Sequence, residues 1–374
     1  MNVRLAIWIT DWFGDSADLY FETLQADVAY FTSVSRFQTL VNSCAVAFKS
    51  ALQKFVESSA RMAGRPSLGA RIARTIAYLF QLLFCSIWKD LFHSLSWKRK
   101  CVQDQVIVIT GGAMGIGKRL AEMFALEHKA KVVILDQNEA EALKTVAGIR
   151  DRGATAHSFV CDVTNPDDLR QCAAKIAENP ALGKADIIIC NAGISGFGLI
   201  LDVSDAMLKK TLDVNVLGVF NTIRAFLGPM ISRNQGHVVT IGSICGFAGD
   251  VYGSAYCSSK YAVRGIMESL ENELHDRDIT GVRCTTVYPY FTETAMVTYE
   301  PTSTFYNVIP LDKCIRSIVD AVLKEKRTSF IPSTFFFIFY IVKPFLSKHS
   351  FFASRKWLNF RYGPPIVKTA DAVV

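Results

Sequence analysis

The sequence predicts an α/β fold: a doubly wound parallel sheet in a single domain, with an apolar N-terminal extension and an aromatic C-terminal tail. From Gln105 onward, short β-rich runs alternate with longer helical stretches, as repeated βαβ units do. A glycine-rich turn follows the first run, at the sheet edge where such folds bind ligands. The 374 residues, 50% of them hydrophobic, suffice for one large domain plus an extension.

The expected strands are 105–110, 131–136, 156–161, 185–190, 236–242 and 281–287. We place the catalytic domain at residues 103–329 and a substrate loop at 295–310. Residues 1–70 are expected to form a helical extension, which either lies on a membrane or packs on the enzyme domain, because apolar residues recur at helical spacing from Phe37. Residues 71–102 form a membrane-associating segment with a basic linker, and residues 330–374 form an apolar tail.

The glycine-rich turn is Thr110–Gly117, TGGAMGIG, between the apolar run 106–109 and a helix expected over 118–128. A strand, glycine turn and helix in this order make a phosphate cradle at the helix N-terminus. Gly111 permits the tight turn, Gly115 lets a pyrophosphate approach the backbone, and Gly117 packs the helix on the sheet. A nucleoside-triphosphate loop is excluded, because Arg119 stands where that motif needs Ser or Thr.

The second strand ends at Asp136, about 20 residues beyond the glycine turn. A carboxylate there accepts hydrogen bonds from ribose hydroxyls and repels a 2′-phosphate. Met114 in the glycine turn supplies no cation for that phosphate. NAD is therefore expected over NADP; the alternative is an Asp that caps the next helix.

A third pattern lies in Val238–Lys260, VVTIGSICGFAGDVYGSAYCSSK. The β-rich run delivers Ser243 to a loop, and Lys260 follows Tyr256 by one helical turn on the same face. A nearby ammonium favours the phenolate, so Tyr256 is expected to act as a general base while Ser243 holds the substrate oxygen. Taken alone, this spacing is far more often that of an ordinary amphipathic helix.

Together with Asn191-Ala192-Gly193 and Asn215, these patterns resemble the short-chain dehydrogenase/reductase family over about residues 103–360. That family has a Rossmann-like fold. Pro289–Thr294 and the aromatic tail are similar to its membrane- and lipid-droplet-associated branch, which holds retinol and 17-beta-hydroxysteroid dehydrogenases.

The resemblance implies further roles. Asn215 would complete a proton relay through a water, the alternative being a structural Asn within a long helix. Lys260 would also bind the nicotinamide ribose, and Tyr290 and Phe291 would narrow the substrate mouth. The remaining cofactor contacts that it implies are Ile116 beside the three glycines, Asp162, Val163, Asn191, Ala192, Gly193, Tyr256, Pro289 and Thr294.

Composition points to a membrane surface. Mean hydropathy is +0.23 and net charge is +7, without a zinc-finger or basic-aromatic RNA motif, so no nucleic-acid partner is expected. The ten cysteines show no paired spacing, which favours a reducing, cytosol-facing environment. The six histidines show no ligand spacing, so no metal is expected.

Two apolar segments flank the domain. Thr75–Trp88 carries no charge for 14 residues, too short for a full span of about 20, which favours an interfacial or re-entrant segment over a buried core helix. Phe330–Leu346 is an aromatic block followed by basic residues and suits a membrane or lipid monolayer. A homodimer contact or a roof over the substrate pocket is the alternative.

The sequence thus predicts an NAD-dependent oxidoreductase that interconverts a lipophilic alcohol (retinoid, steroid or long-chain) and its carbonyl at the endoplasmic reticulum or a lipid droplet. Two alternatives stay open: an NADPH-dependent carbonyl reductase, and a membrane or lipid-droplet coat protein that keeps the fold without turnover.

Overall fold

The structure is a computed structural model that describes residues 71–72, 75, 79, 98–297, 299–303, 307–357 and 361–365. The chain divides into two compact units, Met1–Lys98 and Arg99–Val374. The expected helical extension 1–70, and all of the uncharged segment 75–88 except Thr75 and Leu79, lie outside the described residues. The rest of this section concerns the second unit.

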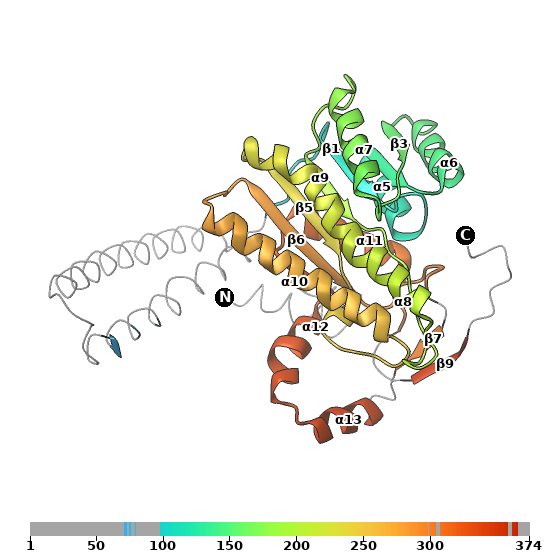
Figure 1. Cartoon of the computed structure of the whole chain (residues 1–374), viewed down its shortest axis with the longest axis vertical. Helices are drawn as coiled ribbons and strands as arrows, with labels where there is room; N and C mark the ends of the chain where they lie inside the picture. The colour runs from blue at the N-terminus through green and yellow to red at the C-terminus, as the bar shows by residue number, and fades with distance from the viewer. Residues whose placement is uncertain are drawn as a thin grey trace, which may run out of the picture. The chain divides into compact units, whose positions relative to one another are not determined.

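A seven-stranded sheet organises this unit, in the order β3-β2-β1-β4-β5-β6-β8 (Figure 1). Every neighbouring pair in it is parallel. Its strands are β1 (Val106–Thr110), β2 (Lys131–Asp136), β3 (Ala156–Val160), β4 (Ile187–Cys190), β5 (Gly236–Ile241), β6 (Val282–Pro289) and β8 (Thr328–Ile331). The chain winds outward from β1 in one direction and from β4 in the other, which confirms the doubly wound, Rossmann-like fold and creates a ligand-binding edge between β1 and β4.

Six of the seven strands were expected from the sequence, and β8 is the one that was not. β8 is four residues long and pairs with the end of β6, with Tyr288 opposite Phe330. Its last two residues are the first two of the aromatic block 330–346. The continuous apolar pattern of that block therefore gave no sign of a short strand at its start. The strand also crosses the domain boundary expected between residues 329 and 330.

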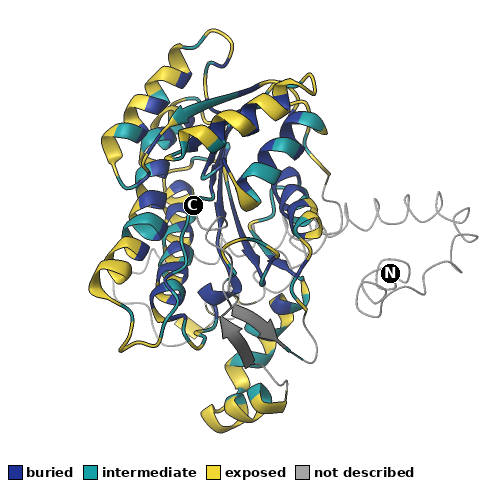
Figure 2. Cartoon of the chain, turned by 90° about the vertical axis from the view of Figure 1, so that its right-hand side faces the viewer, coloured by how far each residue is buried: buried dark blue, intermediate teal, exposed yellow. Residues whose placement is uncertain are grey.

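Helices cover both faces of the sheet, as Figures 1 and 2 show. The helices are α5 (Gly115–Leu126), α6 (Glu139–Arg150), α7 (Pro166–Glu178), α8 (Asp205–Leu212), α9 (Gly218–Ser232), α10 (Ser254–Asp276) and α11 (Leu311–Leu323). Side chains of α5, α6 and α11 pack in one core cluster, and those of α7, α9 and α10 in another. Helix α5 begins at Gly115, three residues before the expected start, so its first turn lies inside the glycine motif.

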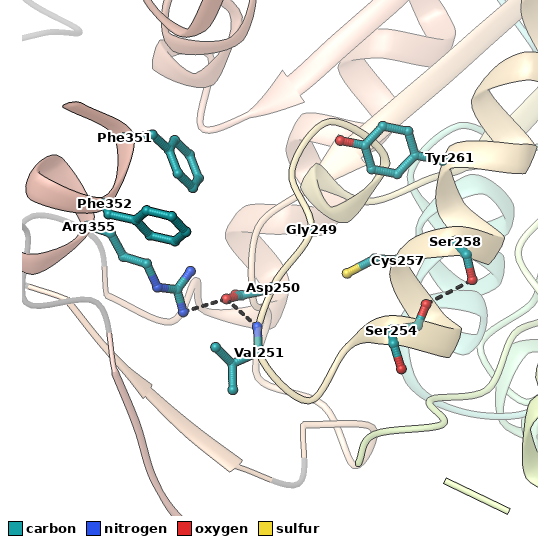
Figure 3. Close-up of a pocket in the computed structure, with 10 residues that line it drawn as sticks. All are labelled: Gly249, Asp250, Val251, Ser254, Cys257, Ser258, Tyr261, Phe351, Phe352 and Arg355. Atoms are coloured by element: carbon teal, nitrogen blue, oxygen red, sulfur yellow. Dashed lines mark hydrogen bonds and ion pairs between the residues drawn. The ribbon is translucent and has the colours of Figure 1, made fainter. Parts of the chain in front are cut away.

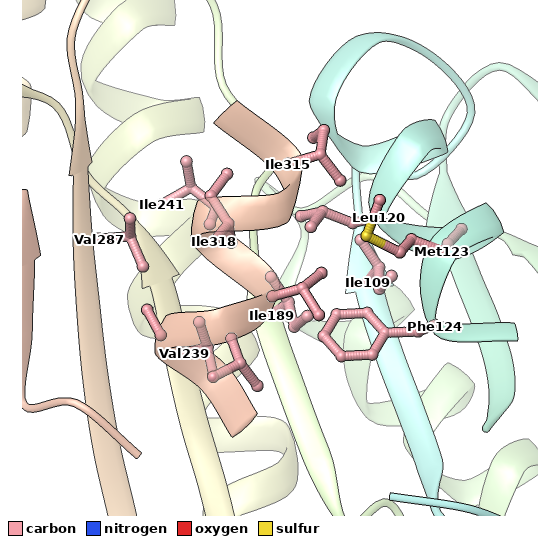
Figure 4. Packing of buried hydrophobic residues seen from close by; sticks show 14 of the residues in the cluster. Ile109, Leu120, Met123, Phe124, Ile189, Val239, Ile241, Val287, Ile315 and Ile318 are labelled. Atoms are coloured by element: carbon pink, nitrogen blue, oxygen red, sulfur yellow. The ribbon is translucent and has the colours of Figure 1, made fainter. Parts of the chain in front are cut away.

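Alternation along the strands supplies both clusters. Ile107 and Ile109 of β1 join the first cluster and Val108 joins the second, because successive strand residues point to opposite faces. In the first cluster Phe124 of α5 and Ile318 of α11 are fully buried against the sheet (Figure 4). Burying each such side chain stabilises the fold by about 1.5–3 kcal/mol, so the sheet is held rigidly beneath the loops that carry the site.

The aromatic tail begins with α12 (Thr334–Phe337) and continues through a π-helical turn (Ile338–Val342) and a 3₁₀ turn (Lys343–Phe345) to α13 (Lys348–Trp357). One side packs inward: Phe335 stacks on Tyr290 at 5.4 Å between ring centroids, and Phe339 stacks on Phe247 at 5.3 Å. Other large apolar side chains of the tail remain exposed: Phe336, Phe337, Tyr340, Ile341, Phe345, Phe352 and Trp357. The tail therefore completes the core and presents an aromatic surface at the same time.

The expected substrate loop is partly ordered as a strand. β7 (Tyr299–Thr302) pairs antiparallel with β9 (Arg361–Pro365), so residues near the end of the chain lie beside the segment that follows β6.

One helical run among the described residues, Asp205–Ser232, has the length and hydropathy of a membrane span. It comprises α8, a π-helical segment and α9. Val219, Ile223 and Phe226 of this run are buried in the second core cluster, which accounts for its apolar composition.

The chain enters the domain through two anchored basic residues. Arg99 forms an ion pair with Asp320 at 2.8 Å, and Lys100 Nζ forms one with Glu325 at 3.1 Å. Lys100 Nζ also lies 2.8 Å from Nδ1 of buried His237. Burial is the largest influence on Lys100 and lowers its pKa, although Glu325 acts in the opposite direction. These contacts fix the entry point at the amino ends of β5 and β6, opposite the ligand-binding edge.

Candidate active site

The glycine turn has the shape of a phosphate cradle. Gly111 has φ +64° and Gly115 has φ +55°, values that side-chain-bearing residues rarely adopt. A Cβ at Gly117 would lie 2.1 Å from the Gly111 carbonyl oxygen, so only glycine lets α5 approach the turn. A Cβ at Gly115 would meet nothing within 4 Å, which leaves the start of α5 open to a ligand. Ile116, half-buried, follows in the first turn of the helix.

The end of β4 is locked against this turn. Asn191 Nδ2 donates to the carbonyl oxygens of Thr110 and Gly111 at 3.0 and 2.9 Å. The Thr110 hydroxyl accepts from the amides of Asn191 and Ala192 at 3.1 and 3.2 Å. Gly193 continues the segment, and a Cβ there would lie 3.2 Å from Asn215 Oδ1 and 3.8 Å from the Asn191 carbonyl oxygen. The Asn-Ala-Gly motif thus fixes the two strand ends that flank the ligand-binding edge.

Asp136 binds the glycine turn from the end of β2. Its Oδ2 accepts from the amide of Ala113 at 3.0 Å and its Oδ1 from the amide of Asn138 at 3.0 Å. The cap of α6 is Asn138, whose side chain accepts from the amide of Glu141, so Asp136 is not the cap considered above. A carboxylate has about four acceptor positions, so two remain for ribose hydroxyls.

Asp162 and Val163 follow β3. Asp162 is exposed and accepts from the amide and hydroxyl of Thr164 at 2.9 and 2.8 Å, which forms a tight turn. Val163 is buried, and a Cβ at Gly218 of α9 would lie 2.8 Å from it. The two residues therefore lie at the same sheet edge as Asp136, one strand further out.

Ser243, Tyr256 and Lys260 gather beside the end of β5. Tyr256 and Lys260 lie one turn apart in α10, with Lys260 Nζ 5.5 Å from the centroid of the Tyr256 ring. Lys260 Nζ donates to the carbonyl oxygen of Ile241 at 3.0 Å, which ties the helix to β5 two residues before Ser243. The Ser243 hydroxyl accepts from the amide of Cys245 at 3.2 Å and lies close enough to the Tyr256 phenol to influence its pKa.

Burial dominates the electrostatics of this group. It lowers the pKa of Lys260 to about 8. It also raises the pKa of Tyr256 well above its usual value, while hydrogen bonding to Ser243 acts in the opposite direction. The sequence predicts that the Lys260 ammonium lowers the pKa of Tyr256. In the structure the net shift of the Tyr256 pKa is upward, because desolvation of the phenol outweighs the other influences.

Asn215 lies in the π-helical segment Asp213–Leu217 between α8 and α9 and is buried. Its Oδ1 accepts from the amide of Ile194 at 2.8 Å, and its Nδ2 donates to the Ile194 carbonyl at 2.9 Å and to the Ser259 hydroxyl at 3.0 Å. Ser259 in turn donates to the Tyr256 carbonyl at 2.7 Å. A chain of hydrogen bonds thus connects Asn215 to the helix that carries Tyr256.

In the segment after β6, the position of Tyr290 differs from the one expected from the sequence. Tyr290 is only 3% exposed and stacks on Phe335, so its ring lies in the core and does not line an open mouth. Phe291, half-buried, packs edge-on against it at 5.1 Å. Pro289 is buried at the end of β6, and Thr294 is half-buried in the bend that follows.

Two residues of the site were not identified from sequence. The ring of Phe197, in the loop after β4, lies 5.5 Å from that of Tyr256. Ser259 links Asn215 to α10, as described above. Its position three residues after Tyr256, on the buried side of the helix, was the only sequence signal. The loop of Phe197 carries no pattern that would have placed it.

The arrangement suits proton transfer at an alcohol oxygen. Tyr256 is placed to take or return the hydroxyl proton, and Ser243 to hydrogen-bond the same oxygen. The open glycine cradle, Asp136 and the Asn191 segment fit a dinucleotide along the β1–β4 edge. When bound, a nicotinamide dinucleotide accepts or gives the hydride, while these side chains supply position and charge. Nowhere in the part of the chain that the structure describes do three or more metal-ligating side chains gather.

Comparison with known proteins supports this assignment. A family model described as "short chain dehydrogenase" matches residues 105–303. The chain is 32% identical to human 17-beta-hydroxysteroid dehydrogenase 13 over 71% of its own length and 87% of that protein. It is 34% identical to human estradiol 17-beta-dehydrogenase 11, with 69% and 84% covered. It is 31% identical to mouse epidermal retinol dehydrogenase 2, with 72% and 87% covered.

Solved structures agree on the fold. The crystal structure of gox2181 matches with a TM-score of 0.55 and 26% identity over 62% of this chain and 96% of that one. An alcohol dehydrogenase from the archaeon Thermococcus sibiricus, solved with 5-hydroxy-NADP, matches with a TM-score of 0.52 at 21% identity, over 60% and 94% of the two chains. With the site geometry, these matches show that the chain belongs to the short-chain dehydrogenase family and is an oxidoreductase that acts on CH–OH donors with a nicotinamide cofactor.

Proposed function

We propose that this enzyme interconverts a lipophilic alcohol (a retinoid, steroid or long-chain alcohol) and its carbonyl with NAD at a membrane surface. The main support for the proposal is that Ser243, Tyr256 and Lys260 lie together beside β5. Ser259 connects this group to Asn215 by hydrogen bonds. A protein that keeps the fold only as a coat would not need this buried polar group, which is costly to maintain.

The surroundings of the site support a lipophilic substrate. Phe197 lies against Tyr256, and the loop that continues from it exposes Leu199, Ile200 and Leu201 at 51%, 77% and 93%. Met296, also exposed, is held beside this loop because its carbonyl accepts from Ser195. The names of the relatives, steroid and retinol dehydrogenases, point to the same class of alcohol.

The preference for NAD rests on Asp136. Its two oxygens are held by the amides of Ala113 and Asn138, so its charge is fixed beside the glycine turn. A 2′-phosphate bound at this turn would face a carboxylate that cannot rotate away, whereas two ribose hydroxyls would find acceptors. An NADPH-dependent carbonyl reductase is the alternative that this residue opposes.

The membrane partner rests on the tail. Residues 332–357 contain four Lys or Arg, one His and no Asp or Glu, and their outer side carries exposed aromatic residues. Aromatic side chains among basic residues suit an anionic lipid surface. We place the enzyme on the cytosolic side of the endoplasmic reticulum or on lipid droplets, where such substrates dissolve.

Turnover of a substrate panel tests the proposal. The full-length chain in its membrane fraction is assayed with NAD⁺ and NADP⁺ on retinol, a 17β-hydroxysteroid and a long-chain fatty alcohol. Activity with NAD⁺ on one class is expected, and Tyr256→Phe should abolish it. Tyr261→Phe, an exposed tyrosine one turn along α10, is the matched control and should retain turnover. Absence of turnover on every substrate, with the wild-type chain folded, would favour the coat-protein alternative.

Asp136→Asn tests the cofactor assignment separately. The amide keeps an acceptor for one backbone N–H but loses the charge and one acceptor oxygen. Hydrogen bonds to charged groups are worth roughly 1.5–3 kcal/mol, so KM for NAD⁺ should rise about 10- to 100-fold while that for NADP⁺ falls. A wild-type enzyme that prefers NADP⁺ would contradict the assignment.

A further inference from the structure

Helix α10 has a pocket on the side away from Lys260. The pocket holds about 450 Å³ and lies between the loop before α10, the first turns of α10 and α13 (Figure 3). Its wall is largely apolar, with Val251, Tyr261, Phe351 and Phe352 around it. The sulfur of Cys257 faces this space, and no role described above uses it.

Cys257 has a second thiol beside it. Cys245 lies in the 3₁₀ turn Ile244–Gly246, which packs so closely on α10 that a Cβ at Gly246 would lie 2.9 Å from the Lys260 carbonyl oxygen. Both cysteines are reduced, at 5% and 4% exposure. The interaction between the two thiols lowers the pKa of Cys257 and raises that of Cys245. Of the two thiols, Cys257 is therefore the one that loses its proton more readily.

The position of Cys257 adds to this asymmetry. It lies in the first turn of the 23-residue helix α10, where unpaired backbone N–H groups favour a thiolate. Cys190, by contrast, is buried inside β4, and burial raises its pKa to about 12. Of these thiols, only Cys257 combines a helix N-terminus, a thiol partner and a wall of the pocket.

We propose that Cys257 is an oxidant-reactive thiol and that a hydroperoxide entering this pocket joins Cys257 to Cys245 in a disulfide. The Cys257 thiolate attacks one peroxide oxygen, the O–O bond breaks, and a sulfenic acid forms while the other oxygen leaves as water or an alcohol. The Cys245 thiol then displaces hydroxide from this sulfur as water. Two thiols lose two electrons and two protons, and the peroxide is reduced by the same two electrons.

The disulfide would displace the catalytic residues through the backbone. Cys245 is two residues from Ser243, and Cys257 follows Tyr256 directly. A disulfide draws the sulfurs to about 2.05 Å and fixes the Cβ separation near 3.8 Å, so the Ser243 turn and the first turn of α10 must shift relative to each other. Misplacement of a reacting group by about 1 Å can cost about 100-fold in rate, so oxidation should lower kcat by about 10- to 100-fold and dithiothreitol should restore it.

Mass spectrometry tests the bond independently of turnover. Trypsin releases residues 234–260 as one peptide that contains both cysteines and no internal Lys or Arg. After treatment of the full-length protein with hydrogen peroxide and alkylation, this peptide should appear with two hydrogens fewer and no alkyl groups. With Cys245→Ala, dimedone should instead trap a sulfenic acid on Cys257. With Cys257→Ala, Cys245 should remain reduced.

The pair Cys161 and Cys172 is the matched control, because these two thiols also shift the pKa of one another but do not line the pocket. Oxidation of both pairs at the same rate would overturn the role of the pocket. Failure of the disulfide to form, or full turnover with the disulfide in place, would overturn the proposal itself. Because the peptide measurement needs no substrate, it holds even if the substrate class proposed above is wrong.

Discussion

At the scale of the single residue, Lys260 carries a charge that its surroundings disfavour. It is 6% exposed, and the described hydrogen bond of its Nζ goes to a backbone carbonyl and not to a carboxylate. The drop in its pKa from 10.5 to about 8 corresponds to roughly 3 kcal/mol of lost stability. Because the folded chain holds this proton less tightly, the penalty acts fully below about pH 8 and is relieved as the pH rises toward 10.5.

Lys260→Met should therefore stabilise the fold while it removes activity. The loss of one hydrogen bond to Ile241 offsets about 1 kcal/mol, so Tm at pH 7 should rise by several degrees with turnover lost. The advantage over wild type should shrink between pH 8 and pH 10. Thermal melts across this range check it, with Lys144→Met on exposed α6 as the control that should show no such pH dependence. A variant less stable than wild type at pH 7 would contradict the argument.

At the scale of the element, the glycine turn and α5 act as one unit. The start of α5 touches the Gly111 carbonyl with no room for a side chain at residue 117, whereas a Cβ added at Gly148 on the exposed face of α6 would meet nothing within 4 Å. A glycine-to-alanine substitution is therefore crowded at residue 117 and unhindered at residue 148.

Gly117→Ala should displace α5 from the turn, lower Tm and weaken binding of the dinucleotide more than tenfold. Gly148→Ala should raise stability by roughly 0.5–1 kcal/mol, since helix-interior glycine is unfavourable relative to alanine by that amount. Calorimetry and cofactor titration of the two variants measure both effects. Unchanged cofactor affinity in Gly117→Ala would show that the cradle tolerates the shift.

The π-helical segment makes a second prediction at this scale. Asn215→Ala leaves buried partners at Ile194 and Ser259 unsatisfied, each costing about 1–3 kcal/mol, so both Tm and kcat should fall. Asn221→Ala in the same helical run removes a bond to the Val163 carbonyl and is the matched control. If Asn215 serves a proton relay, only its variant should alter the pH profile of kcat; equal profiles would leave it a structural residue.

The sequence located the parts of the site that depend on local chain geometry. The glycine turn, Ser243, Tyr256 and Lys260 could be assigned because parallel strands bring their carboxyl ends to one edge. Tyr290 was misplaced because its burial depends on Phe335, which lies 45 residues further along. The seventh strand was missed for a related reason: its four residues form a strand only where β6 offers a neighbour. Both errors concern contacts between residues that lie far apart in the sequence.

At the scale of the whole molecule, the tail makes the enzyme amphipathic. Phe345 and Trp357 are 86% and 72% exposed among basic residues, in the part of the tail that follows the core-packed Phe335 and Phe339. Phe345→Ser with Trp357→Ser should weaken binding to vesicles containing anionic phospholipid, and should raise KM for a substrate dissolved in those vesicles without changing KM for a water-soluble alcohol. Leu143→Ser, exposed on α6, is the control. Equal vesicle binding by all three proteins would rule out the tail as the contact.

The ion pair between Asp250 and Arg355, 2.7 Å long, has a consequence for how lipid and substrate act on one another. It ties α13 to the loop that leads into α10 and Tyr256, so a displacement of one is opposed by the other. Where lipid binding at α13 raises the substrate affinity of this loop, thermodynamic reciprocity requires substrate to raise the lipid affinity by the same factor. An enzyme loaded with substrate would then bind the membrane that supplied it more tightly, and less tightly once the product has left.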